Sequence, residues 1–409
     1  MPQDKTKQTA MTTIILRPHK EESLLRFHPW VFSGAIQKIV LDSDYPYSGP
    51  QEGETVKVED AGGNIIGIGH YQTGAIAVRM LQFGADELAA DFWEQRVTAA
   101  YSLRRQAGLI RSNNNIWRLI HGEGDFLPGL VVDVYGGTAV MQAHSAGMHR
   151  NRNLIAKALI AAVPEIKRVY YKSEDTLPQK VREDGCSSGW LAGEGEGGCI
   201  ALENGLKFRI DWEAGQKTGF FIDQRENRAL LEHYSQGRDV LNMFCYTGGF
   251  SVYALRGGAK TVHSVDVSAK AVALVRENVA LNFTLDAPHE AFACDAFEYM
   301  SGIKDKYDLI ILDPPAFAKH RDAIKNALRG YQRINARAIE QIRSGGLLFT
   351  FSCSQAIDKE MFRLAVFSAA AQTARKVRIL HQLHQPMDHP INIYHPEGEY
   401  LKGLVLQVE

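Results

Sequence analysis

Six residues that could bind or react with a ligand occur at the ends of predicted strands. Each lies at or just after a short apolar run, which is typical of a buried strand. Ligands of open α/β sheets bind at the edge formed by the carboxyl ends of the strands. The sequence therefore predicts that these residues share one site: Asn242, Gly248, Asp266, Asp295, Asp313 and Cys353.

The first of these residues belong to a predicted nucleotide-binding unit. Residues 240–244 are expected to form a strand, and the Gly248-Gly249 pair a turn that glycine favours. A helix and a second strand follow, and the second strand ends on Asp266. Asp266 lies 24 residues after Asn242, near the roughly 20-residue offset of a ribose-binding carboxylate. Because the glycines do not form a G-x-G-x-x-G pattern, a single adenosyl group is favoured over a dinucleotide.

Asp313 and Cys353 have the side chains best suited to act on a planar base. Asp313 opens the motif DPPAF (313–317), in which two prolines fix the backbone after the strand. That geometry would present Asp313 to a base on which Phe317 could stack. Cys353 lies among hydroxyl groups in FTFSCS (349–354). A free cysteine is commonly a small core residue, but the strand-end position favours a nucleophile at Cys353. Packing is expected for the other cysteines, Cys186, Cys199, Cys245 and Cys294.

Strands and helices alternate along the C-terminal half, which predicts a doubly wound, Rossmann-like parallel sheet. Ser268 is expected to cap the helix 269–281. Further strands are expected at 307–312 and 346–351, with a long helix at 322–343 between them. This sheet would hold the strand-end residues in register, and the fold class is α/β.

The N-terminal half shows two other patterns. Residues 12–83 contain short β-like runs separated by Gly, Asp and Asn turns, which predict a small β-barrel. Residues 86–108 follow a helical spacing that places Phe92, Val97, Ala100 and Leu103 on one face. We expect a disordered tail at 1–11, the barrel at 12–85, a middle α+β domain at 86–205 and the α/β domain at 206–409.

Composition narrows the function classes. The 409 residues are 45% hydrophobic and 23% charged, as expected of a globular protein with a full core. No apolar run approaches the roughly 20 residues of a membrane span, and residues 1–13 lack the hydrophobic core of a secretory signal. We therefore expect a cytoplasmic protein with no membrane partner. The cysteines show no metal-ligand spacing, so no metal is expected. The net charge of −1 means that any nucleic-acid surface must be local.

The sequence also resembles a known family over nearly its whole length. Seven motifs carry the resemblance: HPWVFSG (28–34), KTGFFIDQR (217–225), NMFCYTGGF (242–250), DPPAF (313–317), FSCS (351–354), DHP (388–390) and PEGEYLK (396–402). They are similar to the ribosomal RNA large subunit methyltransferase I family. The resemblance implies a PUA-type RNA-binding domain, a middle α+β domain and a class I methyltransferase domain. It also implies S-adenosylmethionine as cofactor and C5 of a cytosine in 23S rRNA as target.

On this resemblance, Cys353 attacks C6 of the cytosine and Asp313 hydrogen-bonds N3. Asp266 would bind the ribose and Asp295 the adenine amino group. Many RNA cytosine-C5 methyltransferases have a second cysteine after the motif proline, but Pro315 and Ala316 stand there in this chain, so Cys353 would act alone. The expected cofactor contacts are Gln224, Arg225, Asn242, Tyr246, Thr247, Gly248, Asp266, Asp295, Asp313 and Pro314. For Gln224 and Arg225, ion pairing at the sheet edge is an equal alternative.

One local basic feature could contact the RNA. Lys325, Arg329, Arg333 and Arg337 are spaced by four residues, so they lie along one side of the predicted helix. They form either a phosphate-contacting stripe or a solvated helix face.

Two rival functions stay open at this point. A base-amine methyltransferase would also use Asp-Pro-Pro with a nearby aromatic ring, and it would need no cysteine. A non-catalytic RNA-binding assembly factor would use the N-terminal barrel alone. RNA is the expected partner in each case, and the sequence leaves the oligomeric state open, a homodimer included.

Overall fold

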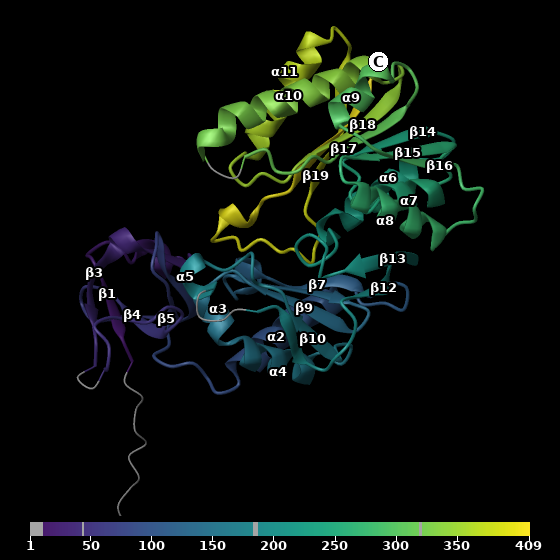
Figure 1. Cartoon of the computed structure of the whole chain (residues 1–409). Coiled ribbons are helices and arrows are strands. Elements are labelled where there is room, and N and C mark those ends of the chain that lie inside the picture. Colours follow the sequence, from purple (N-terminus) through teal and green to yellow (C-terminus); the bar gives the residue numbers. More distant parts are fainter. Residues whose placement is uncertain (1–10, 43–44, 183–186, 319–320) are drawn as a thin grey trace, which may run out of the picture. The chain divides into compact units, whose positions relative to one another are not determined.

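A computed structural model describes residues 11–42, 45–182, 187–318 and 321–409, and the predicted tail, apart from Met11, and Cys186 lie outside them (Figure 1). The chain divides into two compact units. The first comprises residues up to 110, 117–197 and 388–398, and the second comprises 111–116, 198–387 and 399–409. The chain therefore leaves the second unit after Met387, contributes a short segment to the first, and returns at Glu399.

A six-stranded sheet forms the N-terminal part of the first unit. Its order is β2-β6-β5-β4-β1-β3, and all neighbours are antiparallel except the parallel pair β1 and β4. Buried aliphatic residues such as Ile14, Val58 and Val78 fill its core. The elements are β1 (Thr13–Leu16), α1 (Glu22–Leu25), β2 (Trp30–Phe32), β3 (Ile36–Val40), β4 (Thr55–Glu59), β5 (Ile65–Tyr71) and β6 (Ile76–Phe83).

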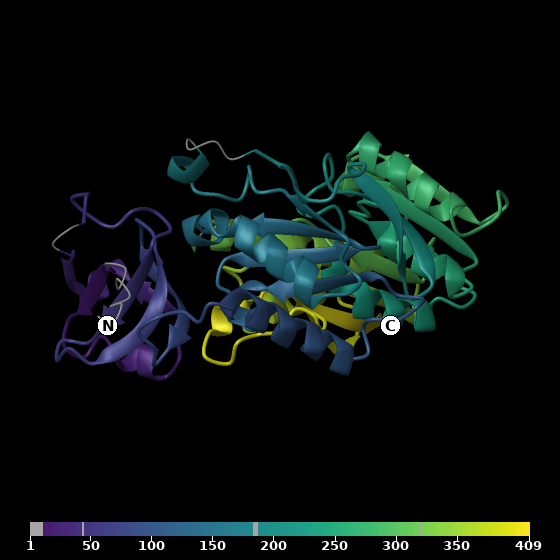
Figure 2. The same cartoon turned by 90° about the horizontal axis from the view of Figure 1, so that it is seen from below.

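A second, five-stranded sheet completes the first unit, in the order β11-β10-β9-β8-β7. The helices α2 and α4 lie side by side along it (Figure 2). The elements are α2 (Phe92–Gln106), β7 (Ile116–His121), β8 (Leu130–Tyr135), β9 (Thr138–Ala143), α3 (Ala146–Arg150), α4 (Arg152–Ala162), β10 (Arg168–Tyr171), α5 (Gln179–Arg182) and β11 (Gly189–Ala192).

The buried face predicted for α2 is wrong at Leu103. Phe92, Val97 and Ala100 are buried, but Leu103 is 42% exposed and its neighbour Arg104 is fully buried. The guanidinium of Arg104 forms an ion pair with Asp125 and donates to the carbonyl of Asp388. A buried charge that is paired and hydrogen-bonded can occupy a core position, and here it takes the place expected for the leucine.

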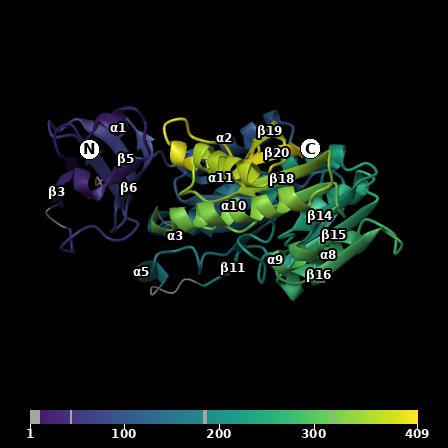
Figure 3. The same cartoon turned by 90° about the horizontal axis from the view of Figure 1, so that it is seen from above.

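The second unit is built on a seven-stranded sheet with the order β16-β15-β14-β17-β18-β20-β19. α9, α10 and α11 cover one face, and α6, α7 and α8 cover the other (Figure 1). α10 and α11 run side by side (Figure 3). Its strands are β14 (Asp239–Met243), β15 (Thr261–Asp266), β16 (His289–Ala293), β17 (Leu309–Leu312), β18 (Gly346–Ser352), β19 (Val377–His384) and β20 (Lys402–Val408). The helices are α6 (Arg225–Tyr234), α7 (Gly249–Arg256), α8 (Ala269–Ala280), α9 (Ala296–Tyr299), α10 (Ile324–Gln341) and α11 (Lys359–Gln372). A hairpin of β12 (Gly198–Glu203) and β13 (Leu206–Asp211) precedes them.

The α/β prediction for this part of the chain is confirmed, with one refinement. β14 to β18 pair in parallel, but β20 runs antiparallel to both β18 and β19. A parallel connection needs a crossover, usually a helix, and the segment between β19 and β20 contains only a short 3₁₀ turn at Pro396–Gly398. The last strand therefore returns beside its predecessor in the opposite direction.

Candidate active site

The strand order reverses between β14 and β17, which lie side by side at the centre of the seven-stranded sheet. In open α/β sheets this switch point opens a crevice at the carboxyl ends of the strands. The turn after β14 and the Asp313-Pro314 sequence after β17 both lie at this edge. Two of the predicted site segments are thus brought together by the topology alone.

The turn after β14 packs closely against α8. Gly248 has φ +81°, and a Cβ there would lie 2.8 Å from a methyl group of Val275, so only glycine fits. The carboxylate of Asp266 accepts the backbone N–H groups of Tyr246 at 3.0 Å and Ser268 at 2.9 Å. These bonds fix the carboxylate, which stays partly exposed and has lone pairs available for ribose hydroxyls. The turn and its acid fit an adenosyl group.

Three other predicted cofactor residues have partners within the protein. The amide of Asn242, which is buried, donates to the Ser251 hydroxyl at 2.8 Å. The carbonyl of Thr247 accepts from Asn278 at 2.8 Å. Asp295 caps α9 by accepting two backbone N–H groups. These bonds hold the loops at the sheet edge, and direct cofactor contacts by these residues stay predictions.

Two further members of the predicted set lie in the segments that follow β14 and β17. The hydroxyl of Tyr246 accepts the backbone N–H of Gln216 at 3.1 Å, which ties the glycine turn to the segment before η3 (Ile222–Gln224). Pro314 is buried directly after Asp313. Cofactor contacts by both residues stay predictions.

Asp313 and Cys353 occupy neighbouring strand ends, as predicted. β17 and β18 are paired in parallel with Leu312 opposite Thr350, so the residues that follow the two strands lie at the same edge. Burial and then the charge of Asp223 raise the pKa of Asp313 to about 7. Burial and then the charge of Asp313 raise the pKa of Cys353 to about 11. The site therefore holds a carboxyl group whose pKa is raised to about 7 beside a thiol whose pKa is also raised.

The backbone around Cys353 is clamped by residues that the sequence interpretation did not single out. The hydroxyl of Tyr331 on α10 lies 2.9 Å from the Ser352 hydroxyl and 3.0 Å from the Ser354 hydroxyl. The ammonium group of Lys402 donates to the carbonyl of Ser354 at 2.7 Å. Burial lowers the pKa of Lys402 to about 8, so it is still a cation at neutral pH. These contacts fix the thiol, and the motif PEGEYLK was the available signal for Lys402.

The KTGFFIDQR segment (217–225) contributes side chains that act on Asp313 and Cys353. Gln224 donates its amide to the Asp313 carboxylate at 3.1 Å. Asp223 accepts the hydroxyl of Tyr400 at 2.7 Å, and its charge raises the pKa of both Asp313 and Cys353. Lys217 supplies the opposing positive charge, which lowers both pKa values. Gln224 is thus part of the site through Asp313, and a second carboxylate, Asp223, joins it.

Arg225 has a different environment. It is buried, and its guanidinium lies 3.4 Å from the carbonyl of Ile116. The expected contact of Arg225 with the cofactor stays a prediction.

The predicted basic stripe lies on the solvent-facing side of α10. Its members, Lys325, Arg329, Arg333 and Arg337, are all exposed. The Arg333 guanidinium lies 4.4 Å from the ring centroid of Phe297, and Arg337 lies 3.7 Å from Glu340. The opposite face of α10 is buried, and it carries the Tyr331 that clamps the Cys353 segment.

Comparison with known proteins gives matches over most of the chain. A family model for S-adenosylmethionine-dependent methyltransferases matches residues 169–403, and a PUA-like domain model matches residues 14–83. Two curated relatives are both named ribosomal RNA large subunit methyltransferase I. The one from Alteromonas mediterranea is 38% identical over 97% of this chain and 98% of its own. The one from Tolumonas auensis is 38% identical over 97% of this chain and 99% of its own.

The chain belongs to the ribosomal RNA large subunit methyltransferase I family. Its cofactor is S-adenosylmethionine. Two solved structures show the same fold over 97% of this chain and all of their own, at 22% identity. They are a candidate SAM-dependent methyltransferase from Streptococcus mutans, with a TM-score of 0.80, and SMU.776, a candidate methyltransferase in complex with SAH, with a TM-score of 0.82.

The predicted site residues, from Gln224 to Cys353, lie within the range that the methyltransferase model matches. Among the residues that the structure describes, no helix is long and apolar enough to cross a membrane. The same residues contain no cluster of histidine, cysteine and acidic side chains arranged to hold a metal ion.

Proposed function

We propose that this methyltransferase forms 5-methylcytosine in 23S rRNA through a covalent adduct between Cys353 and C6 of the target base. The observation that supports this most is the pairing of a clamped thiol with a carboxyl group of raised pKa at adjacent strand ends. An exocyclic amine takes a methyl group directly on its nitrogen and needs no thiol. C5 of cytosine is a weak nucleophile, and it becomes enamine-like only after C6 has been attacked.

Asp313 makes the attack favourable. With a pKa of about 7, its carboxyl group can donate a hydrogen bond to N3 of cytosine at neutral pH. As the sulfur of Cys353 bonds to C6, its thiol proton must leave, because the pKa of this thiol is raised to about 11. The carboxylate form of Asp313 takes that proton and passes it to N3, which neutralises the negative charge that moves onto the ring. Gln224 orients the carboxyl group by donating a hydrogen bond from its side-chain amide to Oδ2 of Asp313. The base must leave its helix to reach the crevice.

When bound, S-adenosylmethionine would supply an electrophilic methyl group, with its methyl–sulfur bond breaking to leave S-adenosylhomocysteine. The C5 carbon takes this methyl group, and a base must then remove the proton from C5. We assign the role of this base to the carboxylate of Asp223, whose charge raises the pKa of both Asp313 and Cys353. The C–H electron pair re-forms the C5=C6 double bond, the C6–S bond breaks, and Cys353 leaves as a thiolate. Tyr400 holds the Asp223 carboxylate in place.

The basic stripe on α10 is proposed to contact phosphates near the target base. Its four side chains are exposed, and the helix that carries them also packs against the Cys353 segment through Tyr331. An RNA strand along this face would therefore be close to the sheet edge. Phosphate contacts of this kind weaken as salt concentration rises.

The Asp313-Pro314-Pro315 sequence supports the base-amine alternative. That alternative also needs an aromatic ring to stack on the base, and Phe317, the candidate for this role, packs on another side chain. The ring of Phe317 packs on Tyr331 with centroids 4.7 Å apart. Nucleoside mass spectrometry of rRNA from cells with and without the protein separates the two functions. Loss of one 5-methylcytidine supports the proposal, whereas loss of a methylated guanine or adenine overturns it. Loss of no methylated nucleoside would favour the assembly-factor function.

A further inference from the structure

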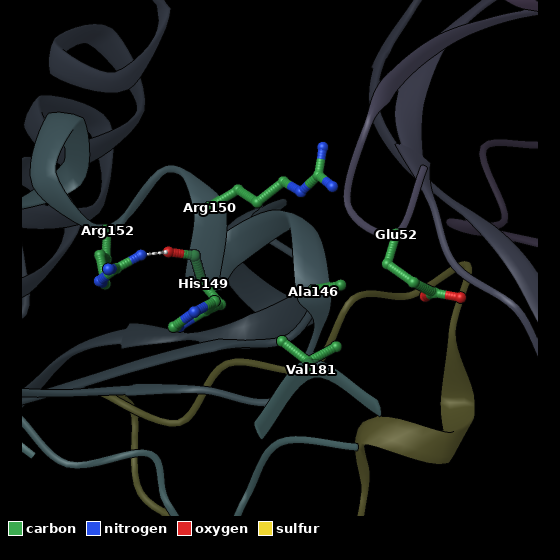
Figure 4. A pocket seen from close by; sticks show the side chains of 6 residues that line it. All are labelled: Glu52, Ala146, His149, Arg150, Arg152 and Val181. Carbon is green, nitrogen blue, oxygen red and sulfur yellow. Dashed lines mark hydrogen bonds between the residues drawn. The ribbon is translucent and has the colours of Figure 1, made fainter. Parts of the chain in front are cut away.

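A pocket of about 270 Å³ lies in the first unit (Figure 4). Two arginines and a histidine line it together with small and apolar side chains. The lining residues are Glu52, Ala146, His149, Arg150, Arg152 and Val181. Glu52 belongs to the PUA-like domain match, and the other residues belong to the part built on the five-stranded sheet.

The walls of the pocket are held firmly against one another. Gly53 has φ +77°, and a Cβ there would lie 2.6 Å from the carbonyl carbon of Ala146, so the loop beside Glu52 touches α3 backbone to backbone. The backbone N–H of Ala146 also donates to the side chain of Gln72 at 3.1 Å. The pocket is therefore a fixed feature of this junction.

The pocket carries an excess of positive charge. Within the described part of the chain, no carboxylate forms an ion pair with Arg150 or Arg152. Arg150 is exposed, and Arg152 donates one N–H to the carbonyl of His149 at 2.9 Å. The Glu52 carboxylate accepts the backbone N–H of Thr73, and Figure 4 shows it turned away from the two guanidinium groups.

Helix α4 adds to this charge. It is an 11-residue helix that begins at Arg152, and its N-cap, Asn151, makes no side-chain cap bond. The start of a helix carries partial positive charge and backbone N–H groups. On the floor of the pocket, His149 is buried and its Nδ1 lies 2.7 Å from the Tyr171 hydroxyl. Among the described residues, neither guanidinium group has a carboxylate partner. Two such groups at a helix start suit a phosphate, which arginine binds with planar, bidentate geometry.

We propose that this pocket binds a backbone phosphate of the RNA substrate, at the junction between the PUA-like domain and the five-stranded sheet. The inference rests on the proposed function, because it takes the substrate to be RNA. RNA is preferred over a small phosphorylated ligand because the pocket is bordered by the domain that the resemblance assigns to RNA binding. The site would anchor the RNA through its backbone without reading its sequence.

The test is RNA binding by the full-length protein at several salt concentrations, with a fragment of large-subunit rRNA as probe. The double variant Arg150→Ala/Arg152→Ala should bind about ten-fold more weakly, and the slope of log affinity against log salt should shrink by about one. The charge-matched control Arg105→Ala/Lys157→Ala removes two exposed cations from α2 and α4 outside the pocket. It should bind RNA within about two-fold of the wild type.

Two further measurements keep the result interpretable. Melting curves and S-adenosylmethionine affinity should be unchanged in both double variants, since the substitutions lie on the first unit. Wild-type RNA affinity and salt slope in the Arg150→Ala/Arg152→Ala variant would overturn the pocket assignment and leave the proposed function standing. Tight binding of inorganic phosphate or a mononucleotide, lost in the variant without any effect on RNA, would also overturn it. If the wild type binds no RNA, the proposed function itself fails.

Discussion

Replacing Asp313 by Asn should stabilise the folded protein at alkaline pH, even though it removes a residue proposed to act in catalysis. The pKa of Asp313 is raised from 3.8 to about 7 in the folded protein. A carboxyl group with a raised pKa opposes folding once it ionises. Its stability contribution is complete below pH 4 and is lost as the pH rises through about 7. Asparagine has no proton to lose, so the variant escapes this loss.

The size of the effect follows from the shift of about three pKa units. At about 1.36 kcal/mol per unit, the ionised carboxylate costs the fold up to ~4 kcal/mol at pH 8. At pH 5 the cost is only ~1.5 kcal/mol, because folding must reprotonate a carboxyl group whose unfolded pKa of 3.8 lies only about one unit below that pH. The side chain keeps some contact with solvent, which screens its charge, so both figures are upper bounds. The free-energy advantage of Asp313→Asn should therefore grow by ~2.5 kcal/mol at most between pH 5 and pH 8.

Urea unfolding at pH 5, 6.5 and 8, followed by circular dichroism, measures this difference. The comparison across pH removes any constant effect of the changed hydrogen bond to Gln224. The control is Asp322→Asn, which replaces an exposed aspartate and should give the same difference from the wild type at each pH. An advantage of Asp313→Asn that is flat across this range, or that shrinks as pH rises, would refute the assigned environment of Asp313.

Two other predictions concern the cofactor and the proton. Asp266→Ala should weaken S-adenosylmethionine binding roughly ten-fold or more, because hydrogen bonds to a charged group contribute about 1.5–3 kcal/mol; unchanged affinity by calorimetry would place the adenosine elsewhere. Asp223→Asn can still accept the Tyr400 hydroxyl but cannot take the C5 proton. With ordinary RNA and labelled cofactor it should accumulate a methylated protein–RNA adduct that survives a denaturing gel, and normal turnover would show that another group is the base.

The parallel core of the sheet could be predicted from the sequence because each of its strands is a short apolar run of consecutive residues. β17 is a run of four apolar residues, and all four are buried. Parallel strands covered on both faces need such runs. Ser268 caps α8 as expected by accepting the N–H of Ala271. The acids and the thiol at the strand ends follow from the same pattern, since each lies next to the run that defines its strand.

The remaining features depend on contacts between distant residues. Arg104 is buried because Asp125 and the carbonyl of Asp388 meet it, and helical spacing alone favoured Leu103 instead. Lys402 reaches the Cys353 segment only because β20 pairs antiparallel with β18, with Ser352 opposite Lys402. Local periodicity cannot reveal such pairings, and so the clamp around the thiol became visible only in the structure.

The central claim is that Cys353 bonds to C6 of a cytosine, and trapping with 5-fluorocytidine tests it most directly. Fluorine at C5 blocks the proton loss that releases the enzyme. With cofactor present, the wild type should therefore give a protein–RNA band that survives a denaturing gel. Cys245→Ala should give the same band, because Cys245 is buried beside the glycine turn. Cys353→Ala, once its melting curve shows a folded protein, should give no band and no methylation while binding S-adenosylmethionine normally. A folded Cys353→Ala variant that still methylates RNA would contradict the account.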